Sequence, residues 1–232
     1  MIRFVTREFN GKTGLALVIS DATASLQDLL DAIQPFSDDS TIYKEYLIDQ
    51  HGTCRGCRIN CCRQSFVIPD RVSFNNLINY FRLSPVEFLA RYADPHKLSY
   101  GLPRFRSGPC VFLKDAMCTI YPYRPLICQL YLCTPMDGDT GELIYSVVSA
   151  GIAELIRYGQ EQGFLPAWST SSASSCGLPS QGSPTGYDRM FIKIIERWAD
   201  NSSNPFCQVN SYTEIRLRDV CPPETWLRLV QT

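Results

Sequence analysis

The sequence predicts an α+β protein that is rich in helices and carries a short β-hairpin. Several segments repeat apolar residues at helical spacing and begin with a residue type that caps helices. Two short apolar runs near the amino terminus flank a turn signal, as the strands of a hairpin do. Eight of the 11 cysteines fall between Cys54 and Cys133, so one middle segment carries most of the chain's reactive side chains.

Composition excludes several classes of partner. The chain has 232 residues, enough to bury a core without covalent help, and a formal net charge of -1. Such a near-neutral balance gives no positive field, so nucleic acid is not an expected partner. No apolar run is long enough to predict a membrane span, and the charged first residues do not predict a secretory signal. We expect a cytoplasmic protein, in which clustered cysteines bind metal more often than they pair.

Residues 1–50 are predicted to form an amino-terminal segment of strands and helices. One strand contains Phe4 and Val5, another spans Gly14–Ser20, and Asn10-Gly11 supplies the turn between them.

A helix is predicted to follow this hairpin. Ser25 and Asp28 have the spacing of a capping box, and apolar residues keep helical spacing until Pro35, where we expect the helix to end. A second, short helix is predicted over Ile42–Gln50.

Two more helices are predicted after the first cysteines. Ser73 is the candidate cap of the first. The second has a sharper start, because Ser84 is followed by proline and then by Glu87 at the capping-box position, and Asp94-Pro95 should end it.

Beyond residue 97 the sequence predicts a hairpin and a helical turn. The runs Cys110–Leu113 and Cys118–Tyr121 are the predicted strands, with residues 114–117 at the tip. Arg124-Pro125 then begins one or two helical turns that reach Tyr131.

A further helix is predicted over residues 142–158, although 143–148 alone would also suit a strand. Residues 168–186 are rich in serine, glycine and proline, as flexible linkers are. They would separate a domain over residues 51–167 from a helical extension over 187–232, in which apolar residues mark an amphipathic helix that ends near Trp198.

The first cysteine set has the spacing of a metal site. Thiolates are soft donors that suit zinc and the iron of iron–sulfur clusters, and a Cys-x2-Cys step lets two sulfurs reach one ion. In a helix Cys54, Cys57 and Cys61 would share one face, and Cys62 would point about 100° away from Cys61. The set therefore provides either three ligands and one outlier, or four ligands divided between two centres.

The second set comprises Cys110, Cys118, Cys128 and Cys133. Five residues of helix would place Cys128 and Cys133 about 140° apart, so both can reach one ion only if the helix ends before Cys133. Thr134-Pro135 favours such an ending. We expect the predicted helices to pack around a centre that these eight cysteines ligate.

Neighbouring residues support a metal without choosing it. Arginines that flank both sets would offset the charge of several thiolates around zinc or in an iron–sulfur cluster: Arg55, Arg58, Arg63, Arg104, Arg106 and Arg124. His51 and His96 are possible further ligands, but each is better interpreted as a surface histidine. Cys207 and Cys221 are interpreted as small apolar residues.

Taken together, the motifs resemble the CxxCxxCC family of YkgJ-like cysteine-cluster proteins. The resemblance rests on the first set and on three later elements: Cys110-Val-Phe-Leu113, Cys118-Thr-Ile-Tyr121 and Arg124-Pro-Leu-Ile-Cys128 with Tyr131. It covers about residues 50–135 and implies a bound zinc or iron, the latter most often as an iron–sulfur cluster such as [4Fe-4S]. Three residues instead of two separate Cys57 from Cys61, and Cys133 is additional to the pattern.

The resemblance leaves three functions open. The first is an iron–sulfur protein with a redox or protein-modification role, and the second is a structural zinc protein or interaction module. A branch of the family resembles flagellin lysine N-methylase, which gives an S-adenosylmethionine-dependent lysine N-methylase as the third. Whether the chain is an enzyme, and which protein is its partner or substrate, stays undecided at this point.

Overall fold

A computed structural model describes residues 1–9, 11–39, 41–46, 61–63, 66–166, 192, 198 and 204–230. These residues are mostly helical and include small antiparallel sheets, so the predicted α-rich α+β class is confirmed. The strands are β1 (Ile2–Phe9), β2 (Lys12–Ile19), β3 (Leu113–Lys114) and β4 (Met117–Cys118). The α-helices are α1 (Leu26–Asp38), α2 (Ile42–Glu45), α3 (Arg71–Phe81), α4 (Pro85–Tyr92), α5 (Pro95–Leu98), α6 (Leu126–Gln129), α7 (Gly138–Glu161), α9 (Leu217–Val220) and α10 (Pro223–Leu229). Short 3-10 helices are η1 (Cys61–Arg63), η2 (Tyr121–Tyr123) and η3 (Tyr212–Glu214).

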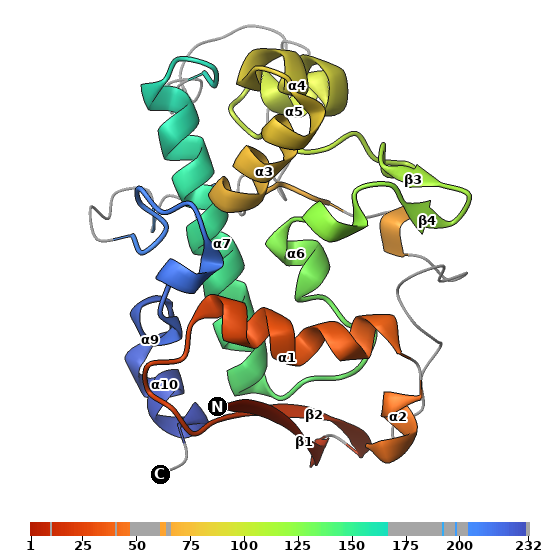
Figure 1. The fold of residues 1–232 in the computed structure, drawn as a ribbon, viewed down its shortest axis with the longest axis vertical. Coiled ribbons are helices and arrows are strands. Elements are labelled where there is room, and N and C mark those ends of the chain that lie inside the picture. Colours follow the sequence, from red (N-terminus) through yellow and green to blue (C-terminus); the bar gives the residue numbers. More distant parts are fainter. Residues whose placement is uncertain are drawn as a thin grey trace, which may run out of the picture.

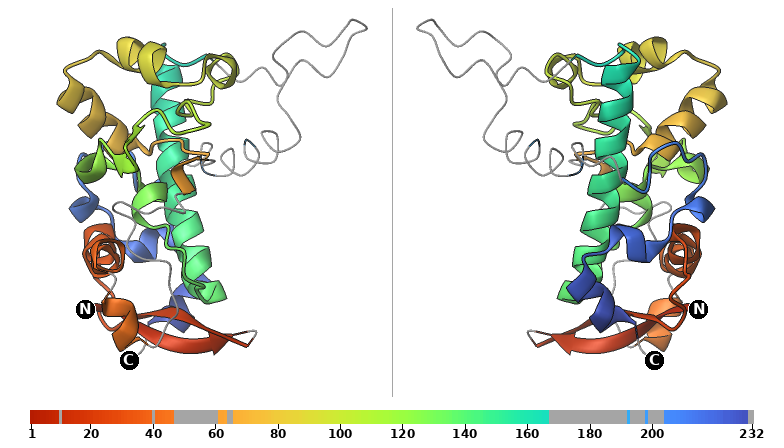
Figure 2. Two further views of the ribbon diagram at one scale, coloured as in Figure 1. Left: turned by 90° about the vertical axis from the view of Figure 1, so that its right-hand side faces the viewer. Right: turned by 90° about the vertical axis from the view of Figure 1, so that its left-hand side faces the viewer.

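Helix α7 runs through the middle of the molecule, with the β1–β2 hairpin at one end and α3, α4 and α5 toward the other (Figures 1 and 2). Every residue from Ser146 to Ile156 is buried, as expected for a helix that is covered on all sides. Helices α3, α9 and α10 and strand β2 all contact it.

The amino-terminal hairpin is fastened to the start of α7. Strands β1 and β2 pair antiparallel from Ile2 opposite Ile19 to Phe9 opposite Lys12. The Leu15 N–H donates to the Pro135 carbonyl over 2.9 Å, and the Leu17 N–H donates to the Thr140 hydroxyl over 2.8 Å. The buried face of β2 therefore packs on the central helix.

Residues 204–230, called here the C-terminal segment, pack in the same core. The Leu26 N–H donates to the Ile215 carbonyl over 2.8 Å, and the Leu217 N–H donates to the Ala24 carbonyl over 2.9 Å. These two bonds pair the C-terminal segment with the residues that begin α1. Val230 forms a further bridge with Ile19 of β2.

Two predicted helix starts are confirmed. Ser25 caps α1 in a full capping box with Asp28, and Ser84 caps α4 in another with Glu87. In each box the serine satisfies a backbone N–H of the first turn, and the acid satisfies the N–H of the serine.

Two other predicted helix boundaries were wrong. Helix α1 continues through Pro35 to Asp38, because Phe36 is buried against Phe4 and Tyr46, at ring distances of 5.3 Å and 5.0 Å. Burial of that ring outweighs the hydrogen bond that the proline nitrogen cannot make. Helix α3 is capped by Asp70 and not by Ser73, which lies in its first turn.

Smaller corrections concern lengths. The second hairpin, predicted over residues 110–121, has strands β3 and β4 of only two residues each. Its tip is Asp115-Ala116 instead of four residues. Both tip residues have positive φ, 51° and 60°, which a two-residue turn between twisted strands requires. Helix α7 is longer than predicted because Asp137 caps it, and residues 143–148 are helix, not strand. Helix α2 ends at Glu45, and residues 47–50 lie outside the described residues.

The predicted linker over 168–186 lies outside the described residues. Of the amphipathic helix predicted beyond it, Ile192 and Trp198 are described; both are helical and partly buried against the core. Among the described helices, none combines the length and the apolar character that crossing a membrane requires.

Gly151 of α7 offers a test of this packing. A Cβ atom on Gly151 would lie 2.7 Å from the Asp70 Cβ and 3.0 Å from the Phe206 ring. Gly151→Ala should therefore lower the free energy of unfolding by about 1–3 kcal/mol through overpacking, measured by urea denaturation. Gly141→Ala in the same helix is the control, because its Cβ would meet nothing within 4 Å, and it should be neutral or stabilising. Equal effects of the two substitutions would contradict the packing described.

Candidate metal centre

Of the first cysteine set, the structure describes Cys61 and Cys62. Cys61 and Cys62 begin η1; Cys61 is exposed and Cys62 is half-buried. A hydrogen bond from the Cys61 thiol to the Cys62 sulfur raises the pKa of Cys61 and lowers the pKa of Cys62. Cys54 and Cys57, the other predicted ligands of this set, lie outside the described residues.

The second set lies on a hairpin and the short helix that follows it. Cys110 precedes β3, Cys118 ends β4 and Cys128 lies in α6, and all three are half-buried. The tight tip turns the chain back on itself, so the Thr119 N–H donates to the Phe112 carbonyl over 2.9 Å. Cys110 and Cys118 are thereby brought to the same end of the hairpin.

Phe112 fastens this hairpin to the helices α3 and α4. Its ring is buried and lies 6.0 Å from the Phe81 ring, 4.8 Å from the Tyr92 ring and 5.0 Å from the Phe105 ring. Aromatic pairs at these distances add to the free energy of burying the rings. The cysteines on either side of Phe112 are therefore held by a packed apolar layer.

The backbone joins the two cysteine sets directly. The Cys110 N–H donates to the Cys62 carbonyl over 2.8 Å. Besides the hydrogen bond from Cys61, which lowers the pKa of Cys62, negative charges on Cys128, Cys110 and Cys118 raise it. These five cysteines, linked by the backbone bond and by their effects on one another's pKa, are called here the thiol cluster.

The thiol cluster suits a positively charged ligand. Burial raises the pKa of Cys128, and negative charges on Cys110 and Cys118 raise it further. Thiolates that raise each other's pKa in this way are stabilised by a nearby positive charge. A metal ion supplies that charge and holds its ligands as thiolates, so the donor set fits zinc or iron.

Backbone groups also favour thiolates at two positions. The pKa of Cys110 and of Cys118 is raised, because burial is the larger effect. A backbone N–H two residues further on donates to each sulfur and offsets part of that increase. The donors belong to Phe112 and Ile120. Hydrogen bonds of this kind stabilise thiolate ligands around zinc and around iron–sulfur clusters.

Arg124 is a cation whose charge influences the pKa of cysteines in the thiol cluster. It is 5% exposed, its guanidinium lies 3.7 Å from the Tyr121 ring centroid, and Nη2 donates to Gln34 Oε1 over 3.1 Å. Its charge counteracts the effect of burial on the pKa of Cys118 and Cys128. Arg124 is therefore placed to offset thiolate charge, and its role beside a metal stays a prediction.

Gln34 and Tyr121, the two partners of Arg124, also line an open cleft of about 380 Å³ between α1 and the turn that precedes α6. Its walls mix amide and carboxylate side chains with apolar ones, and they are formed by Gln27, Leu30, Asp31, Gln34, Asp38, Tyr121, Pro122 and Gln129. Arg124 thus connects a polar surface to the thiol cluster.

The remaining predicted residues differ in their surroundings. Helix α6 ends at Gln129, before the exposed Cys133. This ending is the condition under which Cys128 and Cys133 could both reach one ion. His96 is exposed and packs edge-on against Tyr100, in keeping with a surface histidine. Cys221 is buried in the hydrophobic core, whereas the Cys207 sulfur accepts a hydrogen bond from Arg157.

Over the described residues, no three histidine, cysteine or acidic side chains are arranged closely enough to define a metal ion's position. Cys54 and Cys57 are not among those residues. The composition of the ligand set accordingly stays a prediction, while the meeting of Cys61 and Cys62 with the second set is a feature of the fold.

Sequence analysis missed the residue that supports this arrangement. Asp70 is 1% exposed and accepts hydrogen bonds from the first turn of α3, from the Leu126 N–H of α6 and from the Tyr212 hydroxyl. Its position after Pro69 and before a helical pattern is typical of a helix cap and could have been recognised. The two long-range bonds leave no local pattern in the sequence.

Comparison with known proteins agrees with the cysteine pattern. Residues 53–146 match the CxxCxxCC family model, described as "Putative zinc- or iron-chelating domain". No curated protein and no solved structure matches the chain significantly. The matched residues span both cysteine sets, α3, α4, the hairpin and α6.

Oxidation of the metal-free protein tests whether the sets meet. Because disulfides need close cysteines, mild oxidation should link a peptide containing residues 54–62 to one containing residues 110–128, as read by mass spectrometry after proteolysis. Cys207 and Cys221 serve as internal controls and should stay outside these links. Links found only within each set would contradict the arrangement.

Proposed function

We propose that this chain, which carries a domain of the CxxCxxCC family over residues 53–146, binds a metal centre through thiolates contributed by both cysteine sets. One observation carries the proposal: the hydrogen bond from the Cys110 N–H to the Cys62 carbonyl joins the two sets. Thiolates of one set also raise the pKa of thiols in the other. Each set supplies four thiols, and the bond between the sets allows thiols of both to serve one centre.

The proposed ligands come from both cysteine sets. The thiol cluster supplies Cys61, Cys62, Cys110, Cys118 and Cys128. Cys54 and Cys57 are proposed to complete the first set, and Cys133 is a further candidate because α6 ends before it. More thiols are present than one four-coordinate ion needs, which leaves room for a second centre or for a spare sulfur.

The metal that we propose is iron, held as an iron–sulfur cluster of the [4Fe-4S] type. Such a cluster supplies one-electron redox chemistry. Around it Arg124 would offset negative charge, the Phe112 and Ile120 N–H groups would donate to ligand sulfurs, and burial of Cys128 would limit access of water. These features tune reduction potential in cysteine-ligated clusters and support a redox or protein-modification role.

Zinc is the alternative, because the same donors would hold it as a structural centre. In that case the thiolates would fasten the hairpin, η1 and α6 to each other, and the protein would serve as an interaction module. The lysine N-methylase hypothesis requires S-adenosylmethionine binding, which calorimetry with the intact chain would detect.

Metal analysis of protein purified without oxygen distinguishes these proposals. We expect iron, acid-labile sulfide and a broad visible absorption. A colourless protein with stoichiometric zinc and no sulfide, even after reconstitution, would refute the iron–sulfur assignment and leave the zinc one. Absence of both metals after reconstitution would refute the proposed function.

Single substitutions locate the site. Cys57→Ser and Cys118→Ser should each lower metal content and reduce the melting temperature, because a bound metal contributes to the free energy of folding. Cys176→Ser and Cys207→Ser are matched controls outside the proposed site and should retain wild-type metal content. Loss of metal in either control, measured by the same elemental analysis, would contradict the assignment.

A further inference from the structure

A buried carboxylate lies behind the thiol cluster. Asp70 Oδ1 accepts the backbone N–H groups of Val72 and Ser73 over 3.1 Å and 2.9 Å, and Oδ2 accepts the Ser73 hydroxyl over 2.6 Å. Asp70 is only 1% exposed, so these bonds must replace the water that it has lost. They make Asp70 a rigid part of the start of α3.

The same carboxylate caps a second helix. Pro125 occupies the cap position of α6 and makes no side-chain cap hydrogen bond. Instead the buried Leu126 N–H donates to Asp70 Oδ2 over 3.0 Å, across 56 residues of sequence. Cys128 follows within this single-turn helix, and its N–H donates to the Pro125 carbonyl over 2.8 Å. The Asp70 carboxylate therefore sets the position of the backbone that carries a cysteine of the thiol cluster.

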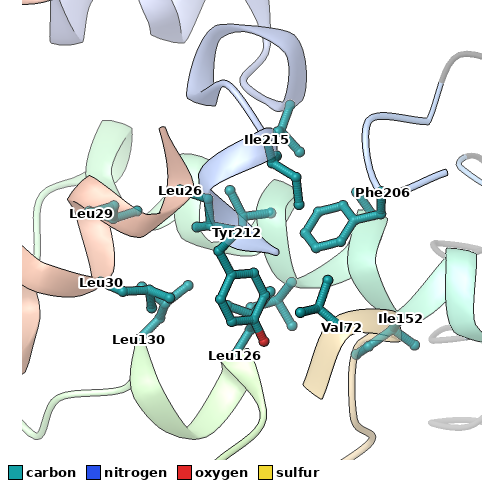
Figure 3. Packing of buried hydrophobic residues seen from close by; sticks show 14 of the residues in the cluster. Leu26, Leu29, Leu30, Val72, Leu126, Leu130, Ile152, Phe206, Tyr212 and Ile215 are labelled. Carbon is teal, nitrogen blue, oxygen red and sulfur yellow. The ribbon is translucent and has the colours of Figure 1, made fainter. Parts of the chain in front are cut away.

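A third element orients the carboxylate. The Tyr212 hydroxyl donates to Asp70 Oδ1 over 3.0 Å. Burial and the nearby Asp70 charge raise the pKa of Tyr212, so its hydroxyl stays protonated and remains a donor. Figure 3 shows its ring among Leu126, Val72 and Phe206, with the hydroxyl directed toward the α3–α6 side of the core.

Tyr212 belongs to the C-terminal segment, which lies outside the matched domain of residues 53–146. That segment has its own anchors: Ile215 and Leu217 pair with the start of α1, and the Asn204 side chain donates to the Ala150 carbonyl over 3.0 Å. The Asp70–Tyr212 bond is thus a polar contact through which a distant part of the chain reaches the cysteine-bearing helix α6.

We infer that Asp70 and Tyr212 are positioning residues of the metal centre, and that the docked C-terminal segment holds Cys128 in place through Tyr212, Asp70 and Leu126. The inference rests on the proposed function, because it concerns retention of the metal. It goes further in making residues outside the family domain part of the site. Loosening the C-terminal segment would then speed release of the metal while every cysteine is still present.

Tyr212→Phe is the decisive variant, since it removes one hydroxyl and keeps the buried ring. The full chain, purified without oxygen with its metal, is mixed with excess chelator well below its melting temperature, and the rate of metal transfer is recorded. The absorption spectrum of the protein reconstituted with Co²⁺ reports thiolate geometry in parallel. We expect metal transfer to be about tenfold faster than in wild type, because hydrogen bonds that support a metal ligand affect metal retention to this degree. We also expect the cobalt absorption bands to differ from those of wild type.

Controls separate positioning from general stability. Tyr80→Phe removes a hydroxyl from an exposed ring on α3, and Ile19→Val removes a buried methyl group from β2. Both should keep the wild-type transfer rate and cobalt spectrum, even where Ile19→Val lowers the melting temperature. Asp70→Asn should exceed Tyr212→Phe in its effect, and Tyr212→Phe remains decisive if Asp70→Asn does not fold.

The outcomes are distinct. Wild-type transfer rate and cobalt spectrum in Tyr212→Phe would overturn the inference and leave the proposed function standing. Faster transfer that Ile19→Val reproduces would also overturn it, because lost stability would then suffice. A wild-type chain that takes up neither native metal nor Co²⁺ would instead refute the proposed function.

Discussion

The fold depends on the hydrogen bonds that the buried carboxylate of Asp70 accepts. Asp70 accepts hydrogen bonds from α3, α6 and the C-terminal segment, and α7 passes so close to it that Gly151 leaves no space for a methyl group. A buried donor or acceptor that loses its partner costs about 1–3 kcal/mol, and a charged one more. Four parts of the chain, distant in sequence, must therefore meet at Asp70 before its burial becomes favourable.

The thiol cluster lies on the elements that meet there. Asp70 sets α6 and hence Cys128, while the Phe112 ring sets the hairpin and hence Cys110 and Cys118. The Cys62–Cys110 bond then brings in the first set. Thiolates near one another raise each other's pKa, and a bound cation would offset that effect, so the apolar packing that gathers the cysteines would also favour the proposed metal.

Local signals in the sequence predicted much of this. Capping boxes at Ser25 and Ser84, the turn of the first hairpin and the cysteine spacing all depend on neighbours within a few residues, and the structure confirms the helices and the hairpin that they indicated. The end of α1 was missed because Phe36 is held by tertiary packing that overrides Pro35. The Asp70–Leu126 and Asp70–Tyr212 bonds span 56 and 142 residues, and no local pattern records them. For the site, the spacing predicted the donors, and the fold showed that the chain at Cys62 meets the second set at Cys110.

X-ray absorption at the metal edge tests the central claim, that thiolates from both sets bind one metal centre, most directly. The wild-type protein should show a shell of about four sulfur neighbours near 2.3 Å. Cys118→Ser should lower the sulfur number of whatever metal it retains, by about one for a single zinc ion and by about a quarter for a [4Fe-4S] cluster, because bridging sulfides supply most of the sulfur around each iron. A shell made mainly of oxygen and nitrogen near 2.0–2.1 Å would contradict the account, as would a Cys118→Ser protein that keeps both the wild-type metal content and the wild-type sulfur shell.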